Sequence, residues 1–270
     1  MYLLSSDLFQ IKAQKLNSDN VNNIIRLLES KEDGHHEIAF SLLESLGAPA
    51  DKDLANVISG NANFLFRAFE QDWKPLLELI KEVTLNFQAL QSLPDGFYKM
   101  INVEYLEMNH CHLKNLSNCI EHFGKLYSVT LNYNDLTCLP DTFNSLENML
   151  ELSLVGNQFK SFPKQIFKLK KLQMLSLIDN QINELPKGLV ELTELKKLLL
   201  RNNELFEIPL EVCMLENLEL LDLSDNKISK LPNAISNLKN LRTLYLDRNK
   251  LSKSEKQKIS YLLPKAIIHF

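Results

Sequence analysis

The chain has 270 residues, 45% of them hydrophobic, which is enough to form a sizeable buried core in one or two domains. Its 30 basic and 34 acidic residues give a net charge of -4 and are mixed along the sequence. A protein that binds nucleic acid or an anionic membrane would carry a basic face, so we expect neither as a partner.

The first residues, 1–15, do not have the features of a targeting segment. They lack a basic start, and their apolar run is too short for a secretory signal peptide. No apolar run elsewhere is long enough to span a bilayer. We therefore predict a cytoplasmic protein without membrane insertion, although a chain from which a signal had been removed would read the same.

Residues 1–78 form the first predicted domain, because their apolar residues recur at helical spacing. The expected helices follow Ser18-Asp19 and then cover residues 37–46, 51–58 and 63–69. Gly47 stands directly after the second of these runs, where glycine commonly ends a helix. We interpret the segment as a helical cap docked on the first of the repeats described next. A second binding surface on it is an alternative that nothing in the sequence demands.

Residues 79–251 repeat themselves every 23 residues without an insertion. The repeated pattern is L-x-x-L-x-L-x-x-N-x-L-x-x-L-P, as in LQMLSLIDNQINELP from Leu172 to Pro186. The block starts are Ile80, Val103, Leu126, Met149, Leu172, Leu195, Leu218 and Leu241. In the L-x-L core, alternation with period two sends the leucines to one face of a short strand. One repeat cannot cover its own leucines, so neighbouring repeats must stack and their strands must align in a parallel sheet.

Two further positions of the repeat have a physical reason. Asparagine at the ninth position can pair backbone groups that would otherwise be buried unpaired in the turn. It is found at Asn134, Asn157, Asn180, Asn203, Asn226 and Asn249, whereas the first two repeats have Gln88 and Cys111. Proline follows the fourteenth position, where it fixes the return path of the chain. It is found at Pro94, Pro140, Pro163, Pro186, Pro209 and Pro232, and Ser117 replaces it in the second repeat.

These motifs resemble those of the leucine-rich-repeat family, in the regular 23-residue class that includes Ras-group and bacterial-like repeat proteins. The resemblance covers about two-thirds of the chain. It implies an α/β solenoid with a parallel β-sheet on the concave side, which serves as a protein-binding scaffold and not as an enzyme.

Residues 252–270 break the period and are expected to cap the solenoid at its C-terminal end. Ser252 or Ser254 can N-cap a short helix with Ile259, Leu262 and Leu263 on one face. Pro264 would end this helix, and the following AIIHF can add a terminal strand.

The outward residues of the strands line one continuous concave surface in such a solenoid. We predict partner binding by Tyr105, Tyr133, Val155, Met174, Ile178, Leu199, Arg201, Leu220, Asp222, Tyr245 and Arg248. They form three zones: aromatic residues together with Phe87 at the N-terminal end, an apolar centre, and charges of both signs with Asp225 and Asp247 at the C-terminal end. An apolar centre with aromatic and arginine neighbours is typical of an interface core and its rim.

Each zone can also be interpreted without a role in partner binding. Single exposed apolar residues are ordinary on any surface, and strands tolerate valine and isoleucine by propensity alone. The aromatic residues Phe87 and Tyr105 could serve only packing. The charged zone could be a solvated face whose ion pairs offset one another.

The sequence favours neither a metal site, nor a disulfide framework, nor acid–base catalysis. In His110-Cys111-His112 the repeat places Cys111 inward and both histidines elsewhere, so the three cannot converge on one metal. The four cysteines contain no C-x-x-C pair, which argues against a zinc site or disulfide framework and fits a reducing compartment. Asp222 and Asp247 lie on an open sheet, where no dry pocket is expected to raise a pKa. We expect no catalytic residue, no metal and no cofactor.

The sequence therefore predicts a module that binds an unidentified protein on the concave face. The first alternative is a self-associating structural protein that forms a homodimer through the concave apolar patch. A remote alternative is an enzyme whose site lies at the junction of helices and repeats.

Overall fold

The computed structural model describes residues 18–32 and 34–270, so the expectation about a signal peptide in residues 1–15 lies outside the described residues. The chain divides into two compact units. The described part of the first is made up of residues 18–32, 34–85 and 94–103, and the second is made up of residues 86–93 and 104–270.

Five helices, a strand and a 3-10 turn make up the described part of the first unit. They are α2 (Ser18–Glu29), α3 (His35–Leu46), α4 (Lys52–Ser59), α5 (Ala62–Glu70), α6 (Lys74–Leu77), β1 (Glu82–Thr84) and η1 (Asp95–Lys99). Asp51 caps α4 by accepting a hydrogen bond from the Leu54 amide at 2.9 Å, and Asn61 caps α5 in the same way. Gly47 follows α3 at a φ of 75°, as expected. The expected helices are confirmed, whereas the short α6 was not expected because four residues show no periodicity.

The helices of this unit close over the first repeat. Helix α5 packs on η1, where the Phe69 and Phe97 rings lie 5.6 Å apart between centroids. Asn102 Nδ2 donates to the Glu78 carbonyl at 2.7 Å. Leu54, Ile58, Leu65 and Leu76 have no exposed surface. The docking of a helical segment on the first repeat is therefore confirmed.

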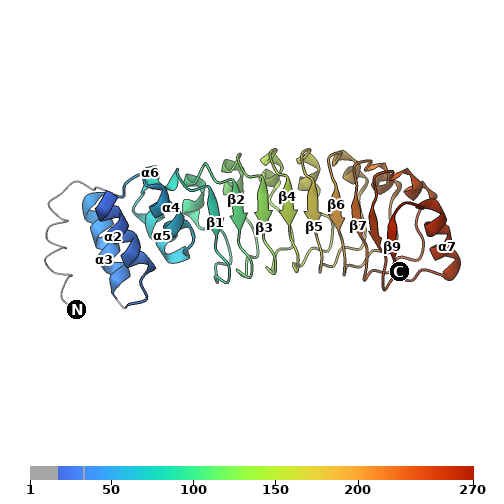
Figure 1. Cartoon of the computed structure of the whole chain (residues 1–270), viewed down its shortest axis with the longest axis horizontal. Helices are drawn as coiled ribbons and strands as arrows, with labels where there is room; N and C mark the ends of the chain where they lie inside the picture. Colours follow the sequence, from blue (N-terminus) through green and yellow to red (C-terminus); the bar gives the residue numbers. More distant parts are fainter. Residues whose placement is uncertain (1–17, 33) are drawn as a thin grey trace. The chain divides into compact units, whose positions relative to one another are not determined.

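The second unit is a parallel sheet that follows chain order. Its strands are β2 (Tyr105–Glu107), β3 (Ser128–Thr130), β4 (Glu151–Ser153), β5 (Met174–Ser176), β6 (Lys197–Leu199), β7 (Leu220–Asp222), β8 (Thr243–Tyr245) and β9 (Ile267–His269). Residues 23 apart are opposite each other, as in Tyr105↔Ser128 and Leu199↔Asp222. The constant period of the sequence therefore sets the register, and the predicted α/β solenoid is confirmed (Figure 1).

Short 3-10 turns lead back from each strand to the next. They are η2 (Asn118–His122), η3 (Asp141–Ser145), η4 (Lys164–Lys168), η5 (Lys187–Glu191), η6 (Leu210–Met214) and η7 (Asn233–Asn237). A repeat proline stands directly before each of them except η2, where Ser117 Oγ accepts from the Cys119 amide at 3.3 Å. The role expected for proline, opening the turn on the return path, is confirmed.

Inward asparagines join the coils to one another. Asn203 Oδ1 accepts from the Ile182 amide of the preceding coil at 2.9 Å, while its Nδ2 donates to the Leu177 carbonyl at 2.8 Å and the Leu200 carbonyl at 3.1 Å. The same arrangement recurs from Asn134 to Asn249. These amides pair buried backbone groups, as the sequence predicts.

The C-terminal cap is built as expected. Ser252 Oγ accepts from the Glu255 amide at 3.1 Å and starts α7 (Lys253–Leu262), whose Ile259 is fully buried. The helix ends before Pro264, and β9 then pairs with β8. Across residues 18–32 and 34–270, none of the helices has the length and apolar character that a membrane span requires.

Candidate functional site

The strands of the second unit present one continuous outer face, which we call the strand face. The central residue of each strand points inward: Leu106, Leu152, Leu175, Leu198, Leu221 and Leu244 have no exposed surface. The residues on either side point outward. Tyr133, Arg201 and Arg248 are exposed, and the other predicted site residues are half-buried. The structure thus places all of them on the strand face, as their register requires.

An aromatic stack occupies the N-terminal end of this face. Phe87 and His110 lie 4.8 Å apart between centroids with 6° between their planes, and His110 and Tyr133 lie 4.6 Å apart with 12°. Phe87 is 75% exposed and Tyr133 is 49% exposed. Tyr105 is not part of these two ring pairs; its hydroxyl donates to Glu107 Oε2. His110 is therefore the middle ring of the aromatic stack, between Phe87 and Tyr133.

The backbone at these rings is left-handed. Phe87, His110 and Tyr133 have φ values of 61°, 55° and 54°. The next repeat has Gly156 at a φ of 65°, and a Cβ added there would lie 2.4 Å from Tyr133 Cδ1. Only glycine both adopts this backbone readily and leaves room for the tyrosine ring.

Beside the ring stack, three asparagine side chains form a row of hydrogen bonds from repeat to repeat, which we call the amide ladder. Asn86 Oδ1 accepts from the Asn109 amide at 2.8 Å, Asn109 Oδ1 from the Asn132 amide at 2.8 Å, and Asn132 Oδ1 from the Val155 amide at 2.9 Å. Each side chain therefore pairs the backbone N–H of the next repeat.

Glu107 is held by donors on this part of the face. The Tyr105 hydroxyl donates to Oε2, and Asn86 Nδ2 and Asn109 Nδ2 donate to Oε1 at 2.7 and 2.9 Å. These hydrogen bonds, that from Tyr105 first, lower the pKa of the Glu107 carboxyl. A carboxylate held in this way stays ionised and is a poor general acid, so no acid–base chemistry follows from it.

The centre of the face is apolar. Val155, Met174, Ile178, Leu199 and Leu220, which we call the central patch, come from the neighbouring repeats of β4 to β7 and are all half-buried. Ser176 lies among them, opposite Ser153 on one side and Leu199 on the other. Its side chain is 4% exposed, and among residues 18–32 and 34–270 its Oγ has no hydrogen-bond partner.

At the C-terminal end, the predicted residues line one open hollow of about 640 Å³. It is lined by Leu199, Arg201, Leu220, Asp222, Ser224, Tyr245, Asp247, Arg248 and Phe270. Arg201 Nε and Arg248 Nε both bind the Asp225 carboxylate, at 3.0 and 2.6 Å. Asp222 Oδ1 accepts from the Ser224 hydroxyl at 2.6 Å. Much of the charge at this end is therefore paired within the chain, which leaves Leu199 and Leu220 as its apolar contact surface.

The sequence His110-Cys111-His112 does not gather at one point. Cys111 is fully buried and its Sγ donates to the Asn109 carbonyl at 3.3 Å, while His112 Nδ1 lies 3.6 Å from the Asp135 carboxylate. Burial raises the pKa of the Cys111 thiol. Within the described part of the chain, no group of three or more His, Cys, Asp and Glu side chains could hold a metal ion.

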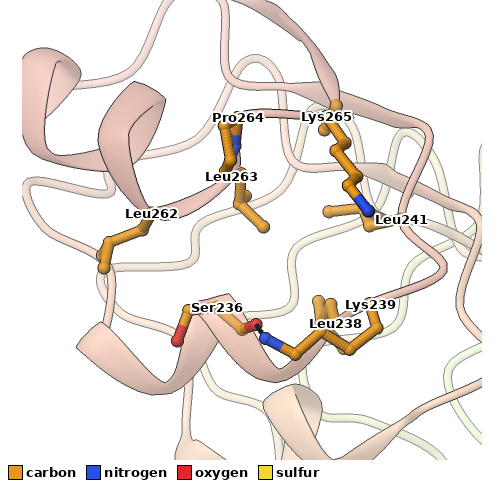
Figure 2. Close-up of a pocket in the computed structure, with 9 residues that line it drawn as sticks. Ser236, Leu238, Lys239, Leu241, Leu262, Leu263, Pro264 and Lys265 are labelled. Atoms are coloured by element: carbon orange, nitrogen blue, oxygen red, sulfur yellow. Dashed lines mark hydrogen bonds between the residues drawn. The ribbon is translucent and has the colours of Figure 1, made fainter.

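A smaller hollow of about 190 Å³ lies between η7 and the C-terminal cap (Figure 2). It is lined by Ser236, Leu238, Lys239, Leu241, Leu262, Leu263, Pro264, Lys265 and Ala266. Lys239 Nζ donates to the Ser236 carbonyl at 2.7 Å, as Figure 2 shows. The hollow is a gap in the packing of leucines at the end of the solenoid, and the polar groups around it form no catalytic arrangement.

Sequence reasoning missed three features of the face. The amide ladder had a visible signal, since asparagine recurs at residues 86, 109 and 132 in one column of the repeat. His110 was placed on this face, but its role as the middle ring was not foreseen. The unpaired hydroxyl of Ser176 has no sequence signal, because it depends on where the neighbouring side chains lie.

Comparison with known proteins gives a consistent result. The family model described as leucine rich repeat matches residues 147–205 and 193–251. A leucine-rich-repeat protein of Leptospira interrogans is 30% identical with a TM-score of 0.53, over 73% of this chain and 62% of that one. No curated protein matches the chain.

Two plant receptors are also similar in fold. The ectodomain of the receptor kinase GASSHO1/SCHENGEN3 from Arabidopsis thaliana, solved in complex with CASPARIAN STRIP INTEGRITY FACTOR 2, is 25% identical with a TM-score of 0.60 over 73% of this chain. The plant peptide hormone receptor RGFR1 in complex with RGF2 is 20% identical with a TM-score of 0.54 over 66% of this chain. The chain spans less than two thirds of the length of each of the three structures: 62%, 30% and 25%.

Proposed function

We propose that this chain, which belongs to the leucine-rich-repeat family, binds a protein partner on its strand face through the central patch. The observation that carries the proposal is the patch itself. Val155, Met174, Ile178, Leu199 and Leu220 lie half-buried at repeat positions where other coils carry polar residues such as Asn132, Glu151 and Asp222. Residues from neighbouring repeats thus form one apolar area, whereas scattered exposed residues would need no explanation.

The surroundings of the patch support this role. On one side the hollow of about 640 Å³ brings Tyr245, Arg201 and Arg248 to its edge. On the other side the amide ladder and Glu107 hold a rigid polar border. An apolar centre within a polar rim is the composition of a protein interface, and a preformed sheet loses little entropy on binding.

The similar structures also support a binding role. The family typically provides non-enzymatic binding scaffolds, and the GASSHO1/SCHENGEN3 ectodomain was solved in complex with CASPARIAN STRIP INTEGRITY FACTOR 2. We propose neither a catalytic role nor a cofactor for this chain, because the carboxylates of the strand face are held by hydrogen bonds and ion pairs in an open sheet.

A capture experiment tests the proposal. Immobilised intact chain is incubated with lysate and compared with Ile178→Asp, which puts a charge into the patch. Leu210→Asp is the matched control, because Leu210 is 60% exposed on η6, away from the strands. We expect Ile178→Asp to lose the partner and Leu210→Asp to keep it, at little change in melting temperature for either. Equal capture by both variants would contradict the site.

Self-association through the same patch is the competing occupant, since an apolar patch can also close a homodimer. Light scattering over a range of chain concentrations separates the two. A mass that doubles with concentration, and stays single in Ile178→Asp, would favour the homodimer over a foreign partner.

A further inference from the structure

The amide ladder ends at the central patch. Asn86, Asn109 and Asn132 each accept the backbone N–H of the next repeat, the last of these being that of Val155. The following residues in the same column are Val155, Ile178 and Arg201, whose side chains have no acceptor. The N–H groups that an asparagine would have paired are therefore left without a side-chain partner from this point.

Two backbone donors are open as a result. The N–H groups of Ile178 and Arg201 find no hydrogen-bond acceptor in the part of the chain that the structure describes. Neighbouring N–H groups are paired, since the Leu177 amide donates to the Leu199 carbonyl at 2.8 Å and the Asp179 amide to the Arg201 carbonyl at 2.9 Å. These two open donors thus lie in the column that the ladder serves elsewhere.

Ser176 adds a third unpaired group at the same place. Its Oγ is buried without a partner, two residues before Ile178 on the same face of the sheet. Ser153, in the same column one strand earlier, differs because its Oγ donates to Asn132 Oδ1 at 2.7 Å. A buried hydroxyl without a partner is unfavourable, and a ligand that supplies an acceptor removes this cost.

We propose that the occupant of the central patch is an extended peptide segment that seats an aliphatic side chain between Ile178 and Leu199, with its main-chain carbonyls accepting from Ile178 N–H and Ser176 Oγ. This inference rests on the proposed function and names the chemistry of the partner. The Ser176 hydroxyl is buried, so the proposal requires the unbranched side chain of Met174, two residues earlier on the same face, to rotate when the segment binds.

The hydrogen-bonding requirement selects this occupant over a folded surface. A helix or a sheet uses its own carbonyls in its internal hydrogen bonds, so it offers side chains but few main-chain acceptors. An extended segment has free carbonyls along its length and presents alternate side chains to opposite sides. Three donors at the base of an apolar patch therefore match an extended backbone with an aliphatic residue.

The probe for the test is a displayed library of random linear peptides of about 12 residues, long enough to cross several strands. It is selected on the intact chain, with the Ile178→Asp variant used to remove peptides that bind elsewhere. We expect enriched peptides to share an aliphatic residue, and their synthetic forms to bind by calorimetry. If no peptide is enriched, or if the enriched ones bind Ile178→Asp equally well, the inference is wrong.

Two variants then test the hydrogen bonds. Ser176→Ala removes the unpaired hydroxyl, so we expect an unchanged or raised melting temperature together with peptide binding weakened by at least about tenfold. Ser153→Ala is the matched control and should leave binding unchanged. A higher melting temperature of Ser176→Ala with unchanged affinity would show that the hydroxyl is only a packing defect, and would overturn its role.

The second variant supplies a side-chain acceptor for the open Ile178 N–H. In Val155→Asn the amide extends the ladder by one step and accepts the Ile178 N–H, as Asn132 does for Val155. We expect Val155→Asn to weaken peptide binding clearly more than Val155→Ala, which removes the same apolar contact without supplying an acceptor. Equal losses in the two variants would show that the open N–H contributes nothing.

The outcomes also separate this inference from the proposed function. If the chain captures a folded protein in a manner sensitive to Ile178→Asp but selects no linear peptide, the proposed function stands and the inference is wrong. If the chain captures no such protein and selects no linear peptide, both are wrong.

Discussion

Replacing Asn203 by alanine probes the contacts that join neighbouring coils. Asn203 is 6% exposed and makes hydrogen bonds with four backbone groups, including the Ile182 amide of the preceding coil at 2.9 Å. Its Nδ2 reaches the carbonyls of Leu177, Leu200 and Arg201 at 2.8, 3.1 and 3.3 Å.

The size of the loss follows from which of these groups keep another partner. Leu177 O also accepts from Asn180, and Leu200 O from Asn226. The Ile182 N–H has no second acceptor in the described chain and becomes a buried orphan. An orphaned buried donor costs about 1–3 kcal/mol, and each remaining hydrogen bond contributes about 1 kcal/mol net, so we expect a loss of roughly 2–4 kcal/mol.

Urea unfolding followed by circular dichroism measures this loss, and the melting temperature should fall by about 2–4 °C for each kcal/mol. Asn217→Ala is the matched control, because exposed Asn217 makes a single hydrogen bond to the Thr193 carbonyl at 2.9 Å. If Asn203→Ala destabilises the chain no more than Asn217→Ala, the inward asparagines do not join the coils in the way described.

Three further perturbations have defined outcomes. Hydrogen bonds lower the pKa of Glu107 below its ordinary value of 4.5, so its contribution to stability is present above that pH and is lost as the pH falls through the folded-state pKa. The difference in melting temperature between the chain and Glu107→Gln should therefore shrink between about pH 6 and pH 3, and a constant difference would contradict the assignment. Burial raises the pKa of Cys213 to about 11, so a thiol reagent at mildly alkaline pH should modify exposed Cys138 quickly and Cys213 only after unfolding; fast labelling of Cys213 in the native chain would be the opposing result. Gly156→Ala, at a φ of 65° and with Tyr133 Cδ1 2.4 Å from the new Cβ, should cost about 1–3 kcal/mol in urea unfolding, and a neutral substitution would show that the ring stack does not need glycine there.

The fold could be predicted because the 23-residue period of the sequence sets the register of neighbouring strands. Leucines that recur every 23 residues can share one core only if each strand pairs with the next in register, as Leu152 and Leu175 do. The inward asparagines, the prolines before the turns and the Ser252 cap are likewise local rules with local causes. Helix α6 was not predicted because its four residues, one of them a proline, are too few to show the helical spacing of apolar residues.

The candidate site was predictable in position but not in chemistry. Alternation along a strand fixes that Ile178 and Leu199 face outward, so the patch could be named from the sequence. Which donors remain unpaired could not be named, because this depends on the direction of single N–H groups and on how the side chains around Ser176 pack. The pairing of both Arg201 and Arg248 with Asp225 likewise depends on rotamers that no repeat rule specifies.

Hydrogen–deuterium exchange of the chain with and without its captured partner tests the strand-face proposal most directly. Binding at the central patch should slow exchange of the open Ile178 and Arg201 amides and of the neighbouring ends of β5 and β6, while peptides from η5 and η6 exchange as before. Slowed exchange confined to the 3-10 turns, with Ile178 unaffected, would contradict it.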